Sequence, residues 1–491
     1  MFIGLDLGTS SLKALLLDRE HRVRATASVP LTVQQPHALW REQHPADWWG
    51  ACELALTALL GEAAGQGIRA DEIAAIGLSG QMHGATLLGA GDEVLRPAIL
   101  WNDGRSHEEC AELERRVPTS REITGNLMMP GFTAPKLLWV ARHEPAVFER
   151  VRKVLLPKDW LRLQLTGEYA SDMSDAAGTL WLDMARRDWS DALLVATGLT
   201  RQHMPSLHEG PAITGVLRAE LAKRFGLRRI PVVAGAGDNA AGAIGMGIVR
   251  PGQGMLSLGT SGVFFVATDG FLANPARGVH SFCHALPRTW HLMSVMLSAA
   301  SCLDHTAQLT GAADVPSLLA AAERRGLNAA TPSYLPYLNG ERTPHNNPKA
   351  RAVFFGIDAA TELADLANAT LEGVGQGLVD GIEAVEATGA RAVEVTLVGG
   401  GSRSGYWAQM LADIANRPLL LREGGDLGPA LGAARLARMG IDGGAPDDLC
   451  PVPAAIGEFV PDPARHALLA RRRALYHRLY EQLRPLYAEL M

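Results

Sequence analysis

Short apolar runs alternate along the chain with polar connections that are rich in glycine. Residues 2–7 and 12–17 are apolar runs separated by Gly-Thr-Ser at residues 8–10, a pattern that predicts a β-hairpin with a tight turn. Residues 73–78 and 98–100 are two more apolar runs, and polar or glycine residues follow each of them directly. We therefore expect buried strands whose ends carry the polar chemistry.

Helical patterns lie between and after these predicted strands. They fall at about residues 107–117, 133–145 and 158–166. Strands that alternate with helices are typical of an α/β domain, in which ligands bind beyond the ends of the strands. The fold class that we predict is therefore α/β.

The second half of the chain opens with a pattern that matches the first hairpin. Residues 254–266 read GMLSLGTSGVFFV and residues 3–15 read IGLDLGTSSLKAL, so both contain an apolar run, Leu-Gly-Thr-Ser and a second apolar run. An internal repeat of this kind predicts two domains of related topology that face each other. We place the two domains at residues 1–247 and 248–491.

The stretch at the middle of the chain, residues 230–247, reads IPVVAGAGDNAAGAIGMG and contains the most informative acid. A short apolar strand ends in glycines, and Asp238 then stands at the start of a helix of alanine and glycine. A helix N-terminus stabilises nearby negative charge, so an ionised carboxylate is favourable there. The lack of large side chains lets backbone or a ligand approach this helix closely.

Three interpretations of Asp238 are open from these residues: a general base, a structural helix cap, and part of a dinucleotide-binding turn. The letters GAGDNA at residues 235–240 fit the dinucleotide pattern G-x-G-x-x-G/A. That pattern expects an acid about 20 positions later, but none occurs between Asn239 and Asp269. An acid inside the turn would also repel a pyrophosphate. A carboxylate beside a hydroxyl that must lose a proton fits better.

Composition and charge narrow the classes of function. The 491 residues are 47% hydrophobic and 20% charged, and the formal net charge of −6 argues against a dedicated nucleic-acid binder. Five cysteines without CxxC spacing fit a reducing compartment and argue against a disulfide framework or a zinc ribbon. The N-terminus has no basic segment before its apolar run, and no apolar run reaches roughly 18–20 residues. These features predict a cytoplasmic protein of enzyme size.

The two Gly-Thr-Ser turns are candidates for binding phosphate groups. Such a turn points backbone N–H groups and hydroxyls at one place, although a single copy is also common in ordinary hairpins. Two copies, one in each domain, would hold one nucleotide from both sides of a cleft. Asp6 precedes the first turn and is either an anchor for Mg²⁺ or a buried acid bonded to turn amides, while Ser257 stands at the matching place in the second copy.

Three further groups of residues offer binding chemistry and also have a structural interpretation. Met82 and His83 lie in a glycine-flanked loop, where the imidazole would bond a sugar hydroxyl, although a lone histidine is often only a core or surface residue. Trp101 and Asp103 combine a flat surface with polar atoms, as sugar sites do. The glycines at 399–401 follow a strand and would let an adenosine approach closely, or simply connect a strand to a helix.

Taken together, these motifs resemble the FGGY family of carbohydrate kinases. The stretches that carry the resemblance are DLGTSSLK, SGQMHG, ILWNDGR, NLMMPGFTAPKL, GDNAAGA, LSLGTSG, LPYLNGERTPHNN, LVGGGSRS and GPALGAA, and they occur in this order between residue 6 and about residue 435. The QMHG loop, PHALWREQHP and LPYLNGERTPHNN are typical of the members that act on D-xylulose. Only the tail from about residue 440, with a charged amphipathic helix, shows no such likeness.

The resemblance implies an actin/hexokinase-like fold of two ribonuclease-H-like domains on either side of a deep cleft that binds ATP and sugar. It implies transfer of the γ-phosphoryl group of ATP to O5 of D-xylulose, with Mg²⁺, and it makes a homodimer plausible. The residue that falls on the family's catalytic base is Asp238. The residues assigned to Mg²⁺ are Asp6 and Asp238. The residues assigned to the sugar are Met82, His83, Asp238, Asn239, Trp101 and Asp103. The residues assigned to the nucleotide are Gly8, Thr9, Ser10, Gly259, Thr260, Ser261, Gly399, Gly400 and Gly401.

Other functions are compatible with parts of this pattern. A kinase of the same family could take ribulose, gluconate or glycerol as the acceptor, and only a panel of sugars separates these. A non-catalytic ATP-binding sugar sensor would have no need of the base, so the presence of both Asp6 and Asp238 argues against it. An NAD-dependent dehydrogenase would require the dinucleotide interpretation of the turn before Asp238.

Overall fold

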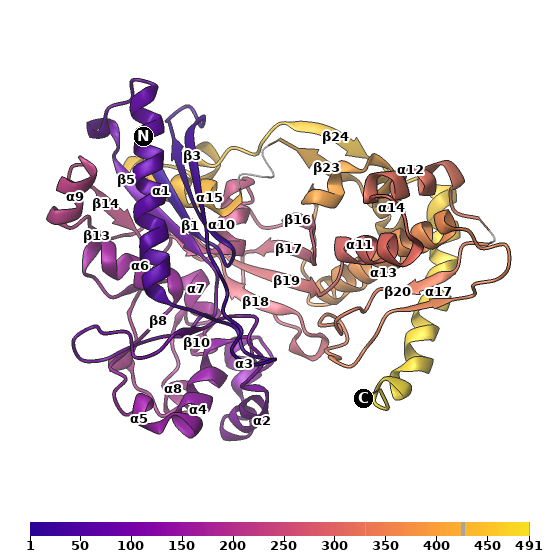
Figure 1. The fold of residues 1–491 in the computed structure, drawn as a ribbon, viewed down its shortest axis with the longest axis horizontal. Helices are drawn as coiled ribbons and strands as arrows, with labels where there is room; N and C mark the ends of the chain where they lie inside the picture. Colours follow the sequence, from indigo (N-terminus) through magenta and orange to yellow (C-terminus); the bar gives the residue numbers. More distant parts are fainter. Residues whose placement is uncertain (329, 424–427, 491) are drawn as a thin grey trace.

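The computed structural model describes residues 1–328, 330–423 and 428–490, and two seven-stranded mixed sheets lie at its centre (Figure 1). Within these ranges, no helix is both long and apolar enough to cross a membrane. The strands of the first sheet are β1 (Phe2–Leu7), β2 (Ser11–Leu17), β3 (Val23–Pro30), β5 (Ala75–Gly80), β13 (Ile213–Val216), β14 (Pro231–Val233) and β15 (Ala236–Gly237). The strands of the second sheet are β16 (Gln253–Leu258), β17 (Gly262–Thr268), β18 (His280–Cys283), β19 (Trp290–Met296), β22 (Glu394–Val398), β23 (Leu419–Arg422) and β24 (Ala455–Phe459).

Helices and short strand pairs surround the two sheets. The helices of the N-terminal half are α1 (Pro45–Gly65), α2 (His107–Arg116), α3 (Ser120–Thr124), α4 (Thr133–His143), α5 (Pro145–Phe148), α6 (Pro157–Thr166), α7 (Met173–Ala177), α8 (Asp191–Ala196), α9 (Ala219–Phe225) and α10 (Asp238–Gly245). Those of the C-terminal half are α11 (Ala300–Thr310), α12 (Val315–Arg325), α13 (Leu363–Glu386), α14 (Gly405–Ala415), α15 (Gly428–Asp442), α16 (Pro446–Leu449) and α17 (Pro463–Tyr487). The remaining strands are β4 (Glu42–Gln43), β6 (Thr86–Leu88), β7 (Ala98–Ile99), β8 (Lys153–Leu155), β9 (Ala170–Asp172), β10 (Leu182–Asp183), β11 (Asp188–Trp189), β12 (Ser206–His208), β20 (Ser333–Leu335) and β21 (Val353–Phe355).

The two sheets share one pattern of strand pairing. In the first, the order β13-β14-β5-β1-β2-β3 places β1 antiparallel to β2 and parallel to β5. In the second, the order β24-β23-β22-β16-β17-β19-β18 places β16 antiparallel to β17 and parallel to β22. The edge strands β13 and β24 are antiparallel to their neighbours in both. The hairpin repeat read from the sequence is therefore a repeat of a whole sheet topology.

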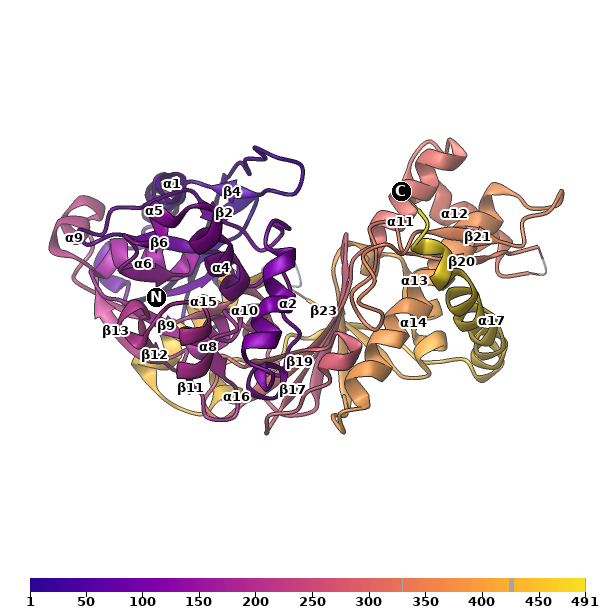
Figure 2. The same ribbon diagram turned by 90° about the horizontal axis from the view of Figure 1, so that it is seen from below.

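Each sheet is covered by apolar residues on both faces. The residues of the first sheet pack against α1 and α6 on one face and against α10 and α15 on the other. The second sheet packs against α11, α13 and α14 on one face. Its other face meets apolar residues of the N-terminal half, and Figure 2 shows this sheet edge-on between the two parts of the molecule. The core between the second sheet and the N-terminal half joins the two halves of the chain.

Helix α15 comes late in the sequence but packs on the first sheet, beside α10. The contact is very close, because a Cβ atom at Gly77 would lie 1.9 Å from the carbonyl oxygen of Ala433, and one at Gly432 would lie 1.8 Å from that of Ala241. Residues 248–491 remain the proposed C-terminal domain, but α15 within that range belongs by its packing to the first sheet. Small residues on both surfaces permit this return of the chain.

We expect Gly77→Ala to lower the free energy of unfolding by about 1–3 kcal/mol or more, because the added methyl group meets fixed backbone in a packed core. The matched control is Gly61→Ala on the exposed side of α1, where nothing lies within 4 Å of a Cβ atom. That change should raise stability by about 0.5–1 kcal/mol. Urea unfolding followed by circular dichroism measures both. Equal effects of the two substitutions would contradict the close packing of α15 on β5.

Candidate active site

Three strands of the first sheet end at the same place. Strands β1, β5 and β15 are parallel, and their register sets Asp6 beside Ser79 and Ser79 beside Ala236. Strand β15 ends at Gly237, and α10 begins with the next residue, Asp238. Because parallel strands end at a common edge, Asp6 and Asp238 face the same region beyond that edge.

Asp238 occupies the first position of α10, with Gly237 as the N-cap. Asn239 donates two hydrogen bonds to Asp238 Oδ1, from its backbone N–H at 2.7 Å and from Nδ2 at 2.9 Å. Burial raises the pKa of Asp238 to about 7, the negative charge of Asp6 acts in the same direction, and the bonds from Asn239 oppose both. The carboxyl group therefore changes its protonation state near neutral pH, as a general base must.

Asp6 is a second buried acid at this edge. Burial raises the pKa of Asp6 to about 6, while the nearby Ser79 hydroxyl and the charge of Lys13 lower it. In the described part of the chain, neither Asp6 Oδ1 nor the Ser79 hydroxyl has a hydrogen-bond partner. A buried carboxylate oxygen without a partner is costly unless a ligand or cation satisfies it.

The residues at this edge fit a magnesium ion. Asp6 offers an unpartnered buried oxygen, and the pKa values of Asp6 and Asp238 are both raised, in the case of Asp238 partly by the charge of Asp6. Mg²⁺ prefers carboxylate and phosphate oxygens, and it usually binds through one or two carboxylates together with the phosphates of a substrate. A divalent cation would compensate the charge of both acids.

Asp238 lines a cavity that residues of both halves of the chain enclose. The cavity has a volume of about 210 Å³, and Asp238 and Asn239 at the start of α10 lie in its wall. Ser257 from β16 and Val398 from β22 form the opposite wall, and Pro429 of α15 also contributes. The carboxyl group of Asp238 thus meets the ends of the second sheet across a small open space.

The Met82–His83 loop follows β5 and lies against the residue before Asp238. A Cβ atom at Gly237 would lie 2.9 Å from Met82 Cγ, and one at Gly178 would lie 2.6 Å from His83 Nδ1. Both glycines are therefore needed to let this loop pack closely. The structure brings Met82 to Gly237, the residue directly before Asp238.

His83 is held in an unusual backbone conformation with φ of 69°. Its carbonyl oxygen accepts hydrogen bonds from Thr133 Oγ1 at 3.1 Å and from the ammonium group of Lys136 at 2.8 Å. Its ring Nδ1 lies 2.6 Å from the carbonyl oxygen of Gly178, which can only accept, so Nδ1 carries the proton. Burial lowers the pKa of His83 to about 3. The ring is neutral, with Nε2 as a hydrogen-bond acceptor.

Trp101 and Asp103 both lie in the loop after β7, but the first is exposed and the second is buried. Trp101 is 42% exposed, and its Nε1 donates a hydrogen bond to Thr9 Oγ1 at 2.9 Å. Asp103 is buried, and its two carboxylate oxygens accept from the guanidinium group of Arg105 at 2.9 and 2.7 Å and from the backbone N–H of Arg41 at 2.6 Å. Asp103 therefore joins two loops, and a direct bond from it to a sugar hydroxyl is not compatible with this arrangement.

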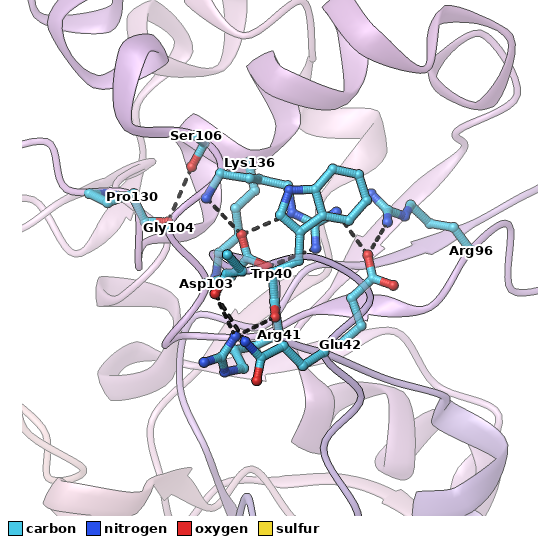
Figure 3. A network of polar contacts seen from close by, with 12 residues as sticks. Trp40, Arg41, Glu42, Arg96, Asp103, Gly104, Ser106, Pro130 and Lys136 are labelled. Atoms are coloured by element: carbon cyan, nitrogen blue, oxygen red, sulfur yellow. Dashed lines mark hydrogen bonds and ion pairs between the residues drawn. The ribbon is translucent and has the colours of Figure 1, made fainter.

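The network around Asp103 explains the Trp-Arg-Glu sequence at residues 40–42 (Figure 3). The guanidinium group of Arg105 lies 3.8 Å from the ring centre of Trp40 and 2.8 Å from a carboxylate oxygen of Glu42. Glu42 also pairs with Arg96. Two arginines, two acids and an aromatic ring thus fix the loops beside Trp101, and this support was not predicted from the sequence.

The residues of the turn at 8–10 differ in their exposure and in their hydrogen bonds. The Thr9 hydroxyl donates to Gln81 Oε1 at 3.0 Å and accepts from Trp101, so two protein groups already bond it. Ser10 is exposed and Gly8 is partly exposed. Of the hydroxyls in this turn, that of Ser10 is therefore the one that faces outward.

A larger cavity, of about 920 Å³, lies in the C-terminal half. Four of the predicted nucleotide residues line it, namely Gly259, Thr260, Gly400 and Gly401. Gly8, Thr9, Ser10, Ser261 and Gly399 do not line it. Gly399 instead forms the turn, because it has φ of 95° and a Cβ atom there would lie 2.7 Å from the carbonyl oxygen of Leu258.

Other residues of this larger cavity were not found from the sequence. They come from α11, α12 and α14 and include Leu303, Asp304, Leu319, Glu323 and Tyr406. Their pattern in the sequence is that of ordinary amphipathic helices, so no local signal distinguishes a cavity wall from a core face. Ser257 of β16 lines the smaller cavity, and the next residue, Leu258, lines the larger one.

A two-domain α/β fold with two acids at the junction and a large cavity in the C-terminal half is compatible with a kinase that phosphorylates a small molecule. The FGGY family of carbohydrate kinases matches the chain in two parts, its N-terminal domain at residues 1–245 and its C-terminal domain at residues 254–441. The chain therefore belongs to the FGGY family of carbohydrate kinases. The predicted family and the actin-like two-domain fold are both confirmed.

Individual proteins with known names are similar to the chain over nearly its whole length. The chain is 57% identical over 492 residues to the xylulose kinase of Escherichia coli K12, covering 99% of this chain and all of that protein. The crystal structure of a xyloylose kinase from Brucella ovis has a TM-score of 0.95 and 49% identity, with 99% of each chain covered. A glycerol kinase from Plasmodium falciparum with ADP has a TM-score of 0.88 at 18% identity, covering 98% of this chain and 97% of that one, and shares the fold.

We expect the His83 ring to remain neutral between pH 5 and 8, because burial holds its pKa at about 3. A histidine exposed to water would gain a proton near pH 6.5. NMR of protein labelled at the histidine ring carbons measures the titration, and the His83→Gln variant identifies the signal. A midpoint near pH 6.5 for this signal would contradict the buried, Gly178-bonded ring.

Proposed function

We propose that this protein transfers the γ-phosphoryl group of ATP to the O5 hydroxyl of D-xylulose and so forms D-xylulose 5-phosphate. The observation that carries the proposal is the place of Asp238, whose pKa is near 7 and whose carboxyl group lines a cavity between the two sheets. Membership of the carbohydrate kinase family and the identity to xylulose kinases support the sugar as substrate.

The sugar side of the site consists of groups that bond hydroxyls. His83 Nε2 accepts a hydrogen bond, since Nδ1 carries the proton towards Gly178. Asp238 and Asn239 lie at the start of α10, and Met82 provides an apolar surface beside them. The exposed ring of Trp101 forms a further wall. We assign these residues to the sugar and assign Asp103 to their support.

The nucleotide side uses the larger cavity and the two matching turns. We propose that the adenosine lies in the 920 Å³ cavity, against Gly400 and Gly401. The phosphates would then extend towards the turns at residues 8–10 and 259–261, where backbone N–H groups and the outward hydroxyls of Ser10 and Ser261 can bind them. This course leads the γ-phosphate to the smaller cavity and to Asp238.

Chemistry at the junction follows from these positions. As O5 forms its bond to phosphorus and the bond from phosphorus to the ADP oxygen breaks, Asp238 accepts the proton that O5 loses. Asp6 and Asp238 are the residues that would hold Mg²⁺, which when bound neutralises charge on the phosphates. Asn239 keeps Asp238 Oδ1 oriented through its two hydrogen bonds. Closing the cleft would exclude water as a competing acceptor.

The acceptor is the part of this proposal that the fold alone does not determine. A gluconate kinase from Lactobacillus acidophilus has a TM-score of 0.93 to this chain at 25% identity. The choice of D-xylulose rests on the higher identity to xylulose kinases and on the QMHG loop. A panel of D-xylulose, ribulose, gluconate and glycerol, assayed for ADP release, decides between them.

We expect Asp238→Asn to lower kcat with D-xylulose by about 10²–10⁴-fold, because the amide cannot accept the proton. Binding of ATP, measured by calorimetry, should change little, since the adenosine cavity is not altered. The control is Asp47→Asn, which removes another acid from the first turn of a helix but at an exposed place on α1. Loss of ATP affinity in parallel with kcat, or normal turnover in Asp238→Asn, would contradict the assignment.

A further inference from the structure

Residues 172–178, which we call the α7 segment, contact both the strand that carries the base and the loop that carries His83. From these contacts we infer that Ser174 and Gly178 are positioning residues that hold Asp238 and His83 in one fixed relation. The inference rests on the proposed function, because it concerns the same sugar site. No motif in the sequence analysis pointed to this segment.

Ser174 connects the α7 segment to the base. Its buried hydroxyl donates a hydrogen bond to Asp172 Oδ1 at 2.5 Å and accepts one from the backbone N–H of Gly237 at 3.0 Å. Gly237 is the N-cap of α10 and directly precedes Asp238. The orientation of the hydroxyl is defined, since a carboxylate can only accept and an N–H can only donate. Ser174 therefore fixes the backbone from which Asp238 projects.

Gly178 connects the other end of the α7 segment to the sugar loop. Its carbonyl oxygen accepts a hydrogen bond from His83 Nδ1 at 2.6 Å. A Cβ atom on Gly178 would lie 2.6 Å from that nitrogen and 2.9 Å from Met82 Cε. The α7 segment thus bonds Gly237, directly before Asp238, at one end, and at the other it bonds His83 and lies close to Met82.

A buried cation anchors the α7 segment. Asp172 accepts from the backbone N–H groups of Ser174 at 2.8 Å and Asp175 at 3.0 Å. The ammonium group of Lys158 lies 2.8 Å from Asp172 Oδ2, 2.5 Å from Asp159 Oδ1 and 3.5 Å from Asp175 Oδ2, and all four side chains are fully buried. Breaking a buried group of charges is strongly destabilising, so the segment has little freedom to move.

The three acids have the spacing of a metal site, but the structure gives them a different partner. Oxygens of Asp159, Asp172 and Asp175 lie within 4.8 Å of one another. The ammonium group of Lys158 lies among them and is within 3.5 Å of each. Burial alone would lower the pKa of Lys158, yet the three carboxylates raise it, so the lysine stays charged. The cluster of acids already contains a cation, Lys158, and holds the α7 segment in place.

The two contacts predict different kinetic effects. Loss of the Ser174 hydroxyl leaves the Gly237 N–H without its partner and frees the start of α10, which moves the base relative to O5. Displacements of about 1 Å at reacting groups can lower rates by about 10²-fold. A change at Gly178 instead displaces His83 and Met82, which bind the sugar before the reaction. The first change should therefore act on kcat and the second on the KM for sugar.

The test compares Ser174→Ala with Ser171→Ala in the full-length enzyme. Ser171 lies in β9, directly before the α7 segment, and is equally buried, but its hydroxyl has no hydrogen-bond partner among the described residues. We expect Ser174→Ala to lower kcat with D-xylulose by about 10²-fold with the KM for ATP unchanged. We expect Ser171→Ala to stay within about twofold of the wild type, because it removes no bond.

A second variant keeps the test decisive if Ser174→Ala does not fold. Gly178 has φ of −74°, which alanine adopts freely, so Gly178→Ala acts only through its clash with His83 and Met82. It should raise the KM for D-xylulose by about tenfold or more and change kcat less. Wild-type kinetics in a folded Ser174→Ala enzyme, equal losses in Ser171→Ala, or an unchanged KM in Gly178→Ala would each overturn the inference.

Failure of the proposed function is separated from failure of this inference by the wild-type assay. If the wild-type enzyme phosphorylates another sugar, that sugar replaces D-xylulose in every comparison, and the ratios between variants keep their meaning. If the wild-type enzyme phosphorylates no sugar, the function fails before any variant is measured. A selective wild-type activity together with unaffected variants rejects the positioning role alone.

Discussion

Two carboxylates lie at one edge of the first sheet, Asp6 buried and Asp238 partly buried in the wall of a cavity, and the rest of the site compensates their negative charge. The pKa of each is raised, to about 6 and about 7. Such a pair is unfavourable unless other groups compensate it. The start of α10, the two bonds from Asn239 and a place for a divalent cation at Asp6 provide that compensation. Burial, together with the charge of Asp6, raises the pKa of Asp238 and keeps it basic enough to accept a proton near neutral pH.

The repeated sheet topology explains how one nucleotide can meet this pair. The central hairpin of each sheet contains a Gly-Thr-Ser turn, and two neighbouring residues of β16, Ser257 and Leu258, line one cavity each. The two copies of the hairpin differ at the position before the turn, where the first has Asp6 and the second has Ser257. Helix α15 packs on the first sheet although its sequence lies between β23 and β24 of the second, so the chain passes between the halves three times.

Patterns along the sequence predicted the features that depend on local order. The two hairpins, the helix that starts at Asp238 and the glycine turn at 399–401 all follow from apolar runs and glycines, and the structure contains them. Features set by distant contacts were not predictable. The Thr9 hydroxyl bonds Trp101, Asp103 is saturated by Arg105 and the Arg41 amide, and α15 returns to the first sheet. The α7 segment was missed for the same reason, since its partners lie far away in the chain.

The most direct test of the account is the position of the phosphate in the product, because Asp238 is argued to activate one particular hydroxyl. Wild-type enzyme would be incubated with ATP, Mg²⁺ and D-xylulose, and the sugar product analysed by carbon NMR for splitting by phosphorus. The account predicts splitting of the C5 resonance and none at C1. Phosphorus coupling at C1, or ADP release without any sugar phosphate, would contradict the proposed geometry of the base and its acceptor.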